Sequence, residues 1–78
     1  MLYNKALKDY KKLQSDFGQK LKLLRERQNL SLRDLAARCE LDFSKIGKIE
    51  AGQTNLKLSS IFELAKGLGV EAKELLNF

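Results

Sequence analysis

Residues 41–52, LDFSKIGKIEAG, are the short stretch that decides the fold of this chain. Ile46 and Ile49 lie three positions apart, which is the spacing of a buried stripe on a helix. Asp42 can cap the N-terminus of a helix, and the closing glycine can end one. The stretch therefore predicts an amphipathic helix over residues 43–50. Whether its outer face is only solvated or enters another molecule decides the function.

The outer face of this predicted helix is narrow and polar. At about 100° of rotation per residue, Ser44, Gly47 and Lys48 fall on the side opposite the two isoleucines. A hydroxyl, a bare backbone and a cation suit entry into the major groove of DNA. Phe43 lies at the edge between the two faces, so core packing and a DNA contact both stay open for its ring.

A second short helix is predicted just before this one. Ser31 and Asp34 have the spacing of a capping box, and the apolar pattern after them extends to Cys39. Only two residues then separate this helix from the Asp42 cap. Two short helices joined by a tight turn form a helix-turn-helix, although many helical proteins contain such a corner by chance.

The rest of the chain is also predicted to be helical, and no strand pattern or repeat is present. Asn29 is expected to take the left-handed conformation that ends a helix. The fold class is therefore all-α, with an N-terminal helical extension over residues 1–15 and a five-helix domain over residues 16–78. The further predicted helices are residues 2–14, residues 16–28 behind a capping box at Asp16, a helix capped by Ser59 or Ser60 that ends at Gly69, and residues 71–76.

Composition excludes several classes of function. The chain has 78 residues, enough for one small domain. It has no histidine and a single cysteine, Cys39, so an internal disulfide, a zinc site and a Cys-His or Ser-His nucleophile are excluded. With no phosphate-cradling loop either, we expect no metal, no cofactor and no enzymatic activity.

The net charge of +5 is unevenly distributed. Residues 1–30 carry eight Lys or Arg against three acids, whereas the remainder carries seven of each. Such a basic segment indicates attraction to phosphates or anionic lipid, or simply a solvated helix surface. No run is long enough to span a membrane, and no signal-peptide core is present. We therefore expect a soluble, reduced, intracellular protein.

Residues 17–76 contain, in order, the pieces Phe17-Gly18, Leu24-Arg25, LSLRDLA and Ile49-Glu50-Ala51-Gly52. With these pieces the chain resembles the phage repressor and Cro-like helix-turn-helix family, of the xenobiotic-response-element type. The terminal helix IFELAKGLGV matches the family as well, and the pieces follow in the family's order and spacing. The compact length, with Leu56 where the family has a proline, resembles more narrowly the controller proteins of restriction-modification systems.

This resemblance implies a homodimeric transcription regulator that binds a pseudo-palindromic site in double-stranded DNA. It also implies a cytoplasmic, nucleoid-associated protein that a prokaryote or phage encodes. The recognition helix would be residues 43–50, and two such helices would lie about 34 Å apart in the dimer. It also implies an ion pair between Arg25 and Glu50 that ties the recognition helix to the first helix of the domain. The implied base contacts are Phe43, Ser44, Gly47 and Lys48, and the implied phosphate contacts are Ser31, Arg33 and Lys45.

The C-terminal apolar residues exceed what one small core obviously needs. They can all be buried, or they can form the two-fold interface that the resemblance implies. We expect the second arrangement. The residues concerned are Phe62, Leu75, Leu76 and Phe78.

Three positions depart from the family pattern. Leu32 replaces a glutamine that usually contacts phosphate, and Glu40 replaces a glycine in the turn. Gly47 weakens the recognition helix by up to about 1 kcal/mol relative to alanine. Leu32 and Gly47, together with Phe43 in the same DNA-facing half, motivate an alternative function. It is a protein-interaction module such as an antitoxin or adaptor that keeps the fold with reduced DNA reading.

Overall fold

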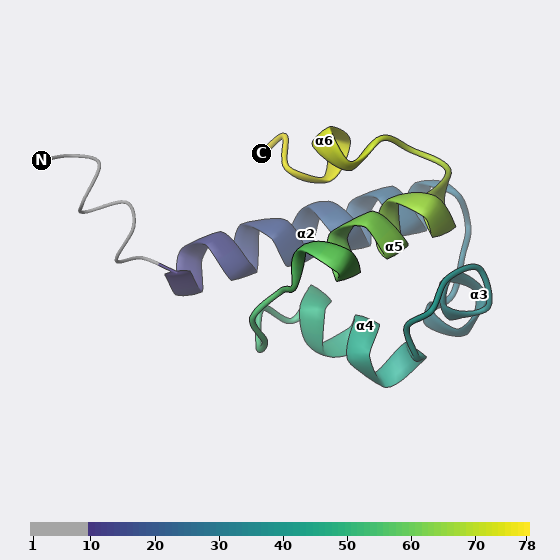
Figure 1. Ribbon diagram of the computed structural model, residues 1–78, viewed down its shortest axis with the longest axis horizontal. Coiled ribbons are helices and arrows are strands. Elements are labelled where there is room, and N and C mark those ends of the chain that lie inside the picture. The colour runs from purple at the N-terminus through teal and green to yellow at the C-terminus, as the bar shows by residue number, and fades with distance from the viewer. Residues whose placement is uncertain (1–9) are drawn as a thin grey trace, which may run out of the picture.

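The computed structural model describes residues 10–78 and is helical throughout its regular structure (Figure 1). The predicted all-α class is confirmed. The first part of the predicted N-terminal helix, residues 2–9, lies outside the described residues. The helices are α2 (Tyr10–Arg27), α3 (Leu32–Ala36), α4 (Phe43–Glu50), α5 (Leu58–Leu68) and α6 (Ala72–Leu75).

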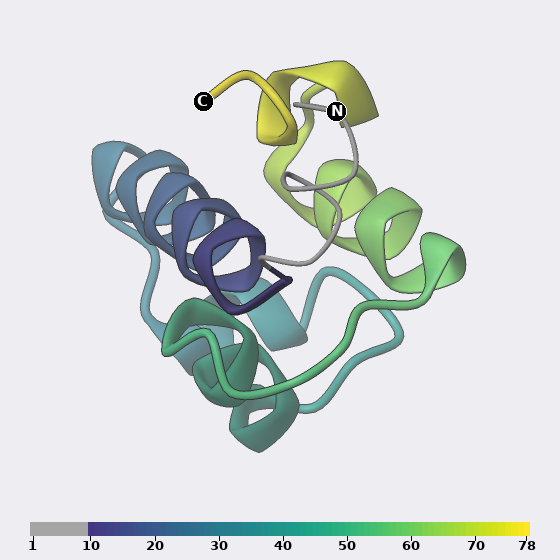
Figure 2. The same ribbon diagram turned by 90° about the vertical axis from the view of Figure 1, so that its left-hand side faces the viewer.

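The helices divide the domain into two ends. Figure 1 shows the long helix α2 beside α5, with α3 and α4 on one side of them and α6 on the other. The perpendicular view in Figure 2 separates α3 and α4 from α6 in the same way. Helix α4 packs against α2 and α3, and α6 packs against α5 and α2. The helix-turn-helix and the C-terminal end therefore present different surfaces.

Helix α2 begins earlier than the sequence pattern predicts. It runs unbroken from Tyr10, so a helix start at Asp16 is wrong. Asp16 instead lies within the helix. Its carboxylate forms a 3.1 Å ion pair with the Lys12 ammonium, one turn earlier. Since neither Gly nor Pro interrupts residues 10–15, nothing in that segment stops the helix. Asn29 ends it with a φ of 58°, as predicted.

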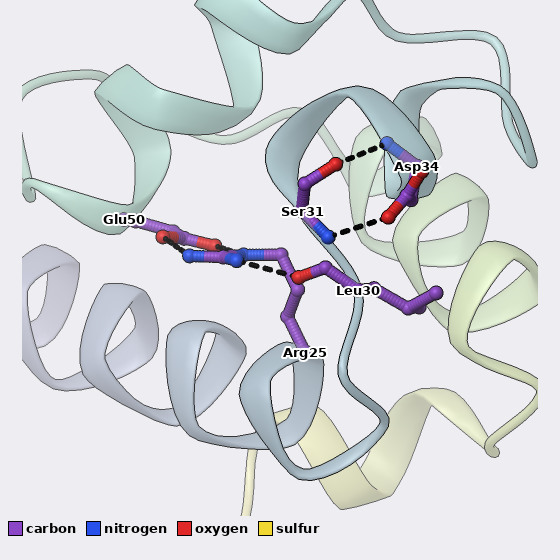
Figure 3. Close-up of polar contacts among 5 residues, drawn as sticks. All are labelled: Arg25, Leu30, Ser31, Asp34 and Glu50. Carbon is purple, nitrogen blue, oxygen red and sulfur yellow. Dashed lines mark hydrogen bonds and ion pairs between the residues drawn. The ribbon is translucent and has the colours of Figure 1, made fainter.

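The caps of the helix-turn-helix are the predicted ones. The Asp34 N–H donates to Ser31 Oγ at 3.0 Å, and the Ser31 N–H donates to Asp34 Oδ2 at 2.9 Å (Figure 3). The Asp42 carboxylate accepts a 2.8 Å hydrogen bond from the Lys45 N–H. Because both helices are short, these bonds satisfy a large share of their otherwise unpaired N–H groups.

Helix α5 starts before its expected serine cap. It begins at Leu58 after Lys57, and no side chain caps it. Ser60 lies inside the helix and is buried, so neither predicted serine is its N-cap. Gly69 ends the helix with a φ of 69°, as predicted.

One small core joins the five helices. Leu75 belongs to it, with none of its surface exposed, so its assignment to a dimer interface is wrong. The one-turn helix α6 folds back over α2 and α5, and this places Leu75 inside. Phe62, Leu76 and Phe78 remain exposed, at 58%, 52% and 55%. The core residues are Phe17, Leu21, Leu30, Leu35, Ile46, Ile49, Leu64, Ala65, Leu68 and Leu75.

Candidate nucleic-acid interface

Helix α4 is held to the domain along its inner face and at its C-terminal end. Ile46 and Ile49 are buried, as predicted. Arg25 of α2 donates from Nε to Glu50 Oε2 at 2.7 Å and from Nη2 to Oε1 at 2.9 Å (Figure 3). Its Nη1 donates to the Leu30 carbonyl oxygen at 2.7 Å. The ion pair that the resemblance implies is therefore present, and one guanidinium joins α2, α4 and the segment before α3.

The hydrogen bonds to Glu50 raise the pKa of Arg25 above its ordinary value. Both side chains of the pair are close to fully buried, at 11% and 8% exposure. A buried charge that lost its partner would keep its desolvation cost without compensation. The pair is therefore part of the scaffold that orients α4.

The turn before α4 differs from the glycine turn that the resemblance implies. Helix α3 ends at Ala36 rather than Cys39, and Glu40 does not have a positive φ. The Glu40 N–H donates to Glu63 Oε1 at 2.9 Å. This bond is the main reason that the pKa of the Glu63 carboxyl lies below its ordinary value, and Lys66 lowers it further. A side chain of α5 thus supports the turn.

Glu63→Gln is expected to lower the free energy of unfolding at neutral pH. The difference from the wild type should shrink as the pH falls below 4.5, the ordinary pKa of this carboxyl. A carboxyl with a lowered folded-state pKa stabilises the fold above its unfolded pKa. That stabilisation is lost as the pH falls through the folded pKa. Urea unfolding across this range measures the difference. Glu74→Gln on the exposed side of α6 is the control, and a Glu63→Gln deficit that persists in acid would contradict the argument.

The outer face of α4 is open to solvent. Ser44 and Lys48 are exposed, and Gly47 is half-buried. Phe43 is 38% exposed and is not a core residue, so the structure decides against core packing for its ring. The guanidinium of Arg33, on α3, lies over this ring, 4.1 Å from its centroid. Of the four implied base contacts, Ser44 and Lys48 are thus fully on the exposed side of α4, with the Phe43 ring and the Gly47 backbone at its edge.

Leu32 and Gly47 fit together between α3 and α4. Leu32 is half-buried and packs against the core. A methyl group on Gly47 would lie 3.6 Å from Leu32 Cδ1, which is an ordinary van der Waals contact. Leu32 therefore cannot make the polar contact that a glutamine would make. Its side chain covers the inner edge of Gly47 instead. No close packing requires a glycine at this position.

Gly47→Ala is expected to raise the free energy of unfolding by up to about 1 kcal/mol, because alanine is the better helix former and the added methyl meets no clash. Urea unfolding measures the gain. If the bare backbone also permits a close approach to DNA, the same variant should bind DNA less well. A loss of stability would mean that α3 and α4 pack more tightly than these contacts indicate.

The implied phosphate contacts occupy separate places. Ser31 is engaged at the start of α3 by its capping box. Lys45 lines a surface hollow on the α5 side of the turn with Lys57 and with two acidic residues, Glu40 and Asp42. Arg33 lies at the Phe43 ring instead. Lys57 is the cation that the sequence pattern did not single out, since its nearness to Lys45 arises only from the packing of α5 beside the turn.

Residues 10–78 hold neither a cluster of metal ligands nor a membrane-spanning helix. No group of three or more His, Cys, Asp or Glu side chains there could hold a metal ion. No helix in that part of the chain is long and apolar enough to cross a membrane.

Known proteins similar to this chain share its helix-turn-helix. The helix-turn-helix domain family matches residues 16–78. The control protein C.BamHI of Bacillus amyloliquefaciens is 41% identical over 63 residues, which are 80% of this chain and 78% of the relative. The family resemblance read from the sequence is confirmed.

Solved structures agree with this match. The restriction-modification controller protein C.AhdI of Aeromonas hydrophila has 42% identity and a TM-score of 0.77, covering 80% of this chain and 94% of that one. The controller protein C.Esp1396I, solved as a tetramer with its natural 35 base-pair operator, has 30% identity and a TM-score of 0.72. That match covers 83% of this chain and 96% of the other.

Proposed function

Because this chain belongs to the helix-turn-helix domain family, we propose that it is a sequence-specific regulator of transcription that binds double-stranded DNA as a homodimer. The observation that carries the proposal is the division of α4 into two faces. Its isoleucines are buried while Ser44 and Lys48 are exposed on the opposite side. The role is a binding one, with no chemical step, and it is exercised in the cytoplasm.

Controller proteins among the relatives support operator binding by an assembly of several copies. C.Esp1396I is a tetramer on its natural operator. C.AhdI shares 42% of its residues with this chain across 94% of its own length. By this likeness we expect the present chain to act on a restriction-modification operator or one of similar pseudo-palindromic design.

The reading surface would be the exposed face of α4 in the major groove. Lys48 can donate to guanine O6 and N7, and Phe43 can pack on a thymine methyl. Ser44 can bond to either kind of base, and Gly47 permits a close approach. Lys45, beside a second lysine in its hollow, would contact phosphate. The Ser31 end of α3 would point at another phosphate.

The dimer would form at the end of the molecule away from this surface. Phe62 on α5, with Leu76 and Phe78 after α6, leave large apolar surfaces exposed. Leu76 and Phe78 also line an apolar groove of 240 Å³ that extends to Tyr10 and Leu13 on α2. Neighbouring exposed apolar residues of this kind mark protein interfaces. A two-fold axis there would leave both α4 helices free to bind DNA.

Selection of bound sites from a random duplex pool tests the function directly. We expect a palindromic winner with half-sites about one helical turn apart, bound far more tightly than random DNA. Binding should weaken steeply with salt, because each neutralised phosphate adds about 0.9 to the log–log slope. Weak binding to all sequences, with no enriched site, would overturn the proposal.

Lys48→Ala is expected to weaken binding to the selected site by about 1–3 kcal/mol and to relax the preference at one base position. Lys73→Ala, an exposed lysine on α6, is the matched control and should change nothing. Titration of both variants against the winner and single-base substitutions measures the effect. Equal weakening on every DNA sequence would show that Lys48 contacts phosphate and does not read a base.

A protein-interaction module, such as an antitoxin or adaptor with reduced DNA reading, is the competing function. It would use Phe43 and the apolar residues near the N-terminus as a docking patch. Arg33 covers one side of the Phe43 ring, which makes this position less apolar than the module would need. The N-terminal residues concerned lie before residue 10, outside the described part of the chain. Absence of any selected DNA site would favour this function.

A further inference from the structure

Arg33 and Phe43 form a stacked pair across the two helices of the helix-turn-helix. The guanidinium carbon lies 4.1 Å from the centroid of the ring. Both side chains are exposed, and within residues 10–78 this ring contact is the interaction that the Arg33 guanidinium makes. Its five N–H donors therefore have no protein acceptor there. An exposed arginine held in this way is prepared for a ligand.

Stacking on the Phe43 ring limits the orientations of the Arg33 guanidinium, which is more restricted than the guanidinium of an isolated surface arginine. The planar group keeps its donors at its edge, and that edge can form two parallel hydrogen bonds to one acceptor pair. Guanine O6 and N7 are such a pair, and bidentate Arg–guanine is the commonest specific contact in the major groove. A phosphate can accept the same pair of hydrogen bonds, so the choice between a base and a phosphate depends on what the rest of the reading surface offers.

The rest of the reading surface leaves room for such a contact. Among its described side chains, Ser44 and Lys48 are the polar ones on the outer face of α4. Leu32, at the neighbouring position on α3, can make no polar contact and packs inward beside Gly47. The two polar side chains of α4 and one aromatic ring are few for a sequence-specific site. An arginine stacked on that ring would supply the missing bidentate reader.

We propose that Arg33 reads a guanine, and that Phe43 positions it there while packing on the methyl group of an adjacent thymine. This inference rests on the proposed DNA-binding function. It replaces the phosphate contact that the family resemblance implies for Arg33. The two residues then act as one unit that selects a neighbouring thymine and guanine, although they come from different helices.

Arg33→Lys tests the proposal, because lysine keeps the charge and loses the planar fork. Arg38→Lys is the matched control, since Arg38 is an exposed arginine of the same turn region. Site selection is repeated with the wild type and both variants, and affinity for the wild-type winner is measured at two salt concentrations. We expect Arg33→Lys to bind about 5- to 150-fold more weakly and to lose its guanine preference at one position, with the salt slope unchanged. Arg38→Lys should match the wild type.

Phe43→Leu then tests the coupling. Leucine can still pack on a thymine methyl but offers no platform for a guanidinium. We expect it to relax the same guanine position that Arg33→Lys relaxes, and the double variant to lose less than the two single losses combined. Both positions are exposed, so we expect each variant to keep the fold. Thermal unfolding of each variant checks this.

Two results would overturn the inference. If Arg33→Lys selects the wild-type site with unchanged affinity, and Arg33→Ala weakens binding equally on all sequences with a salt slope less steep by about 0.9, then Arg33 contacts phosphate. In that case the regulator still selects a site, and only the role of Arg33 is wrong. If the wild type itself selects no site, the proposed function fails and this inference fails with it.

Discussion

Glu50→Ala is expected to lower the free energy of unfolding by about 3–5 kcal/mol, because it leaves the Arg25 guanidinium buried without its counter-charge. The carboxylate accepts two short hydrogen bonds from Arg25, and the pair is almost fully withdrawn from solvent. Only the bond to the Leu30 carbonyl would remain. Urea unfolding of the variant and the wild type measures the loss.

The control is Asp16→Ala, which removes the carboxylate of an exposed ion pair with Lys12 on α2. Surface pairs of this i,i+4 kind contribute about 0.3–0.5 kcal/mol, so the loss should be small. DNA binding should fall in the Glu50 variant even where it remains folded, because α4 is no longer tied to α2. Equal losses in the two variants would mean that the Arg25–Glu50 pair adds no more than a surface pair.

Gly18→Ala is the second large expected effect. A methyl group at position 18 would lie 2.5 Å from the Glu50 carbonyl oxygen and 2.8 Å from its carbon, and closer still to the Ile49 carbonyl oxygen. These are backbone atoms, so no side-chain rotation relieves the clash and α4 must move away from α2. Overpacking of this kind costs about 1–3 kcal/mol or more, which outweighs the gain of up to about 1 kcal/mol in helix propensity.

Gly47→Ala is the natural control, since it makes the same chemical change on a helix where the added methyl has room. The two variants should therefore move the free energy of unfolding in opposite directions. Because the clash at Gly18 displaces the recognition helix, this variant should also bind the selected DNA site less tightly. A stabilised Gly18→Ala variant would show that α2 and α4 do not approach this closely.

Features that depend on neighbours three or four positions apart could be predicted from the sequence. The Ser31 and Asp34 capping box, the Asp42 cap and the buried Ile46 and Ile49 are of this kind. Each involves one turn of helix, where spacing alone decides which groups meet. The all-α class and the helix-turn-helix follow from them.

The same local patterns gave wrong predictions where two different structures satisfy them equally well. Asp16 and the residues after it fit a capping box, but the Asp16 carboxylate can equally form an ion pair within a longer helix, and it does so with Lys12. Leu75 fits a core or an interface, and only the return of α6 over α5 buries it. Local spacing does not choose between such alternatives, because the deciding contact comes from another element.

By itself, then, the sequence determined the class of fold, the limits of the recognition helix and the family. The tertiary structure decided what surrounds that helix: the close approach of Gly18, the support of the turn by Glu63, and the stacking of Arg33 on Phe43. These contacts join residues on different helices. Their geometry depends on how the helices pack, and no periodicity within one helix encodes it.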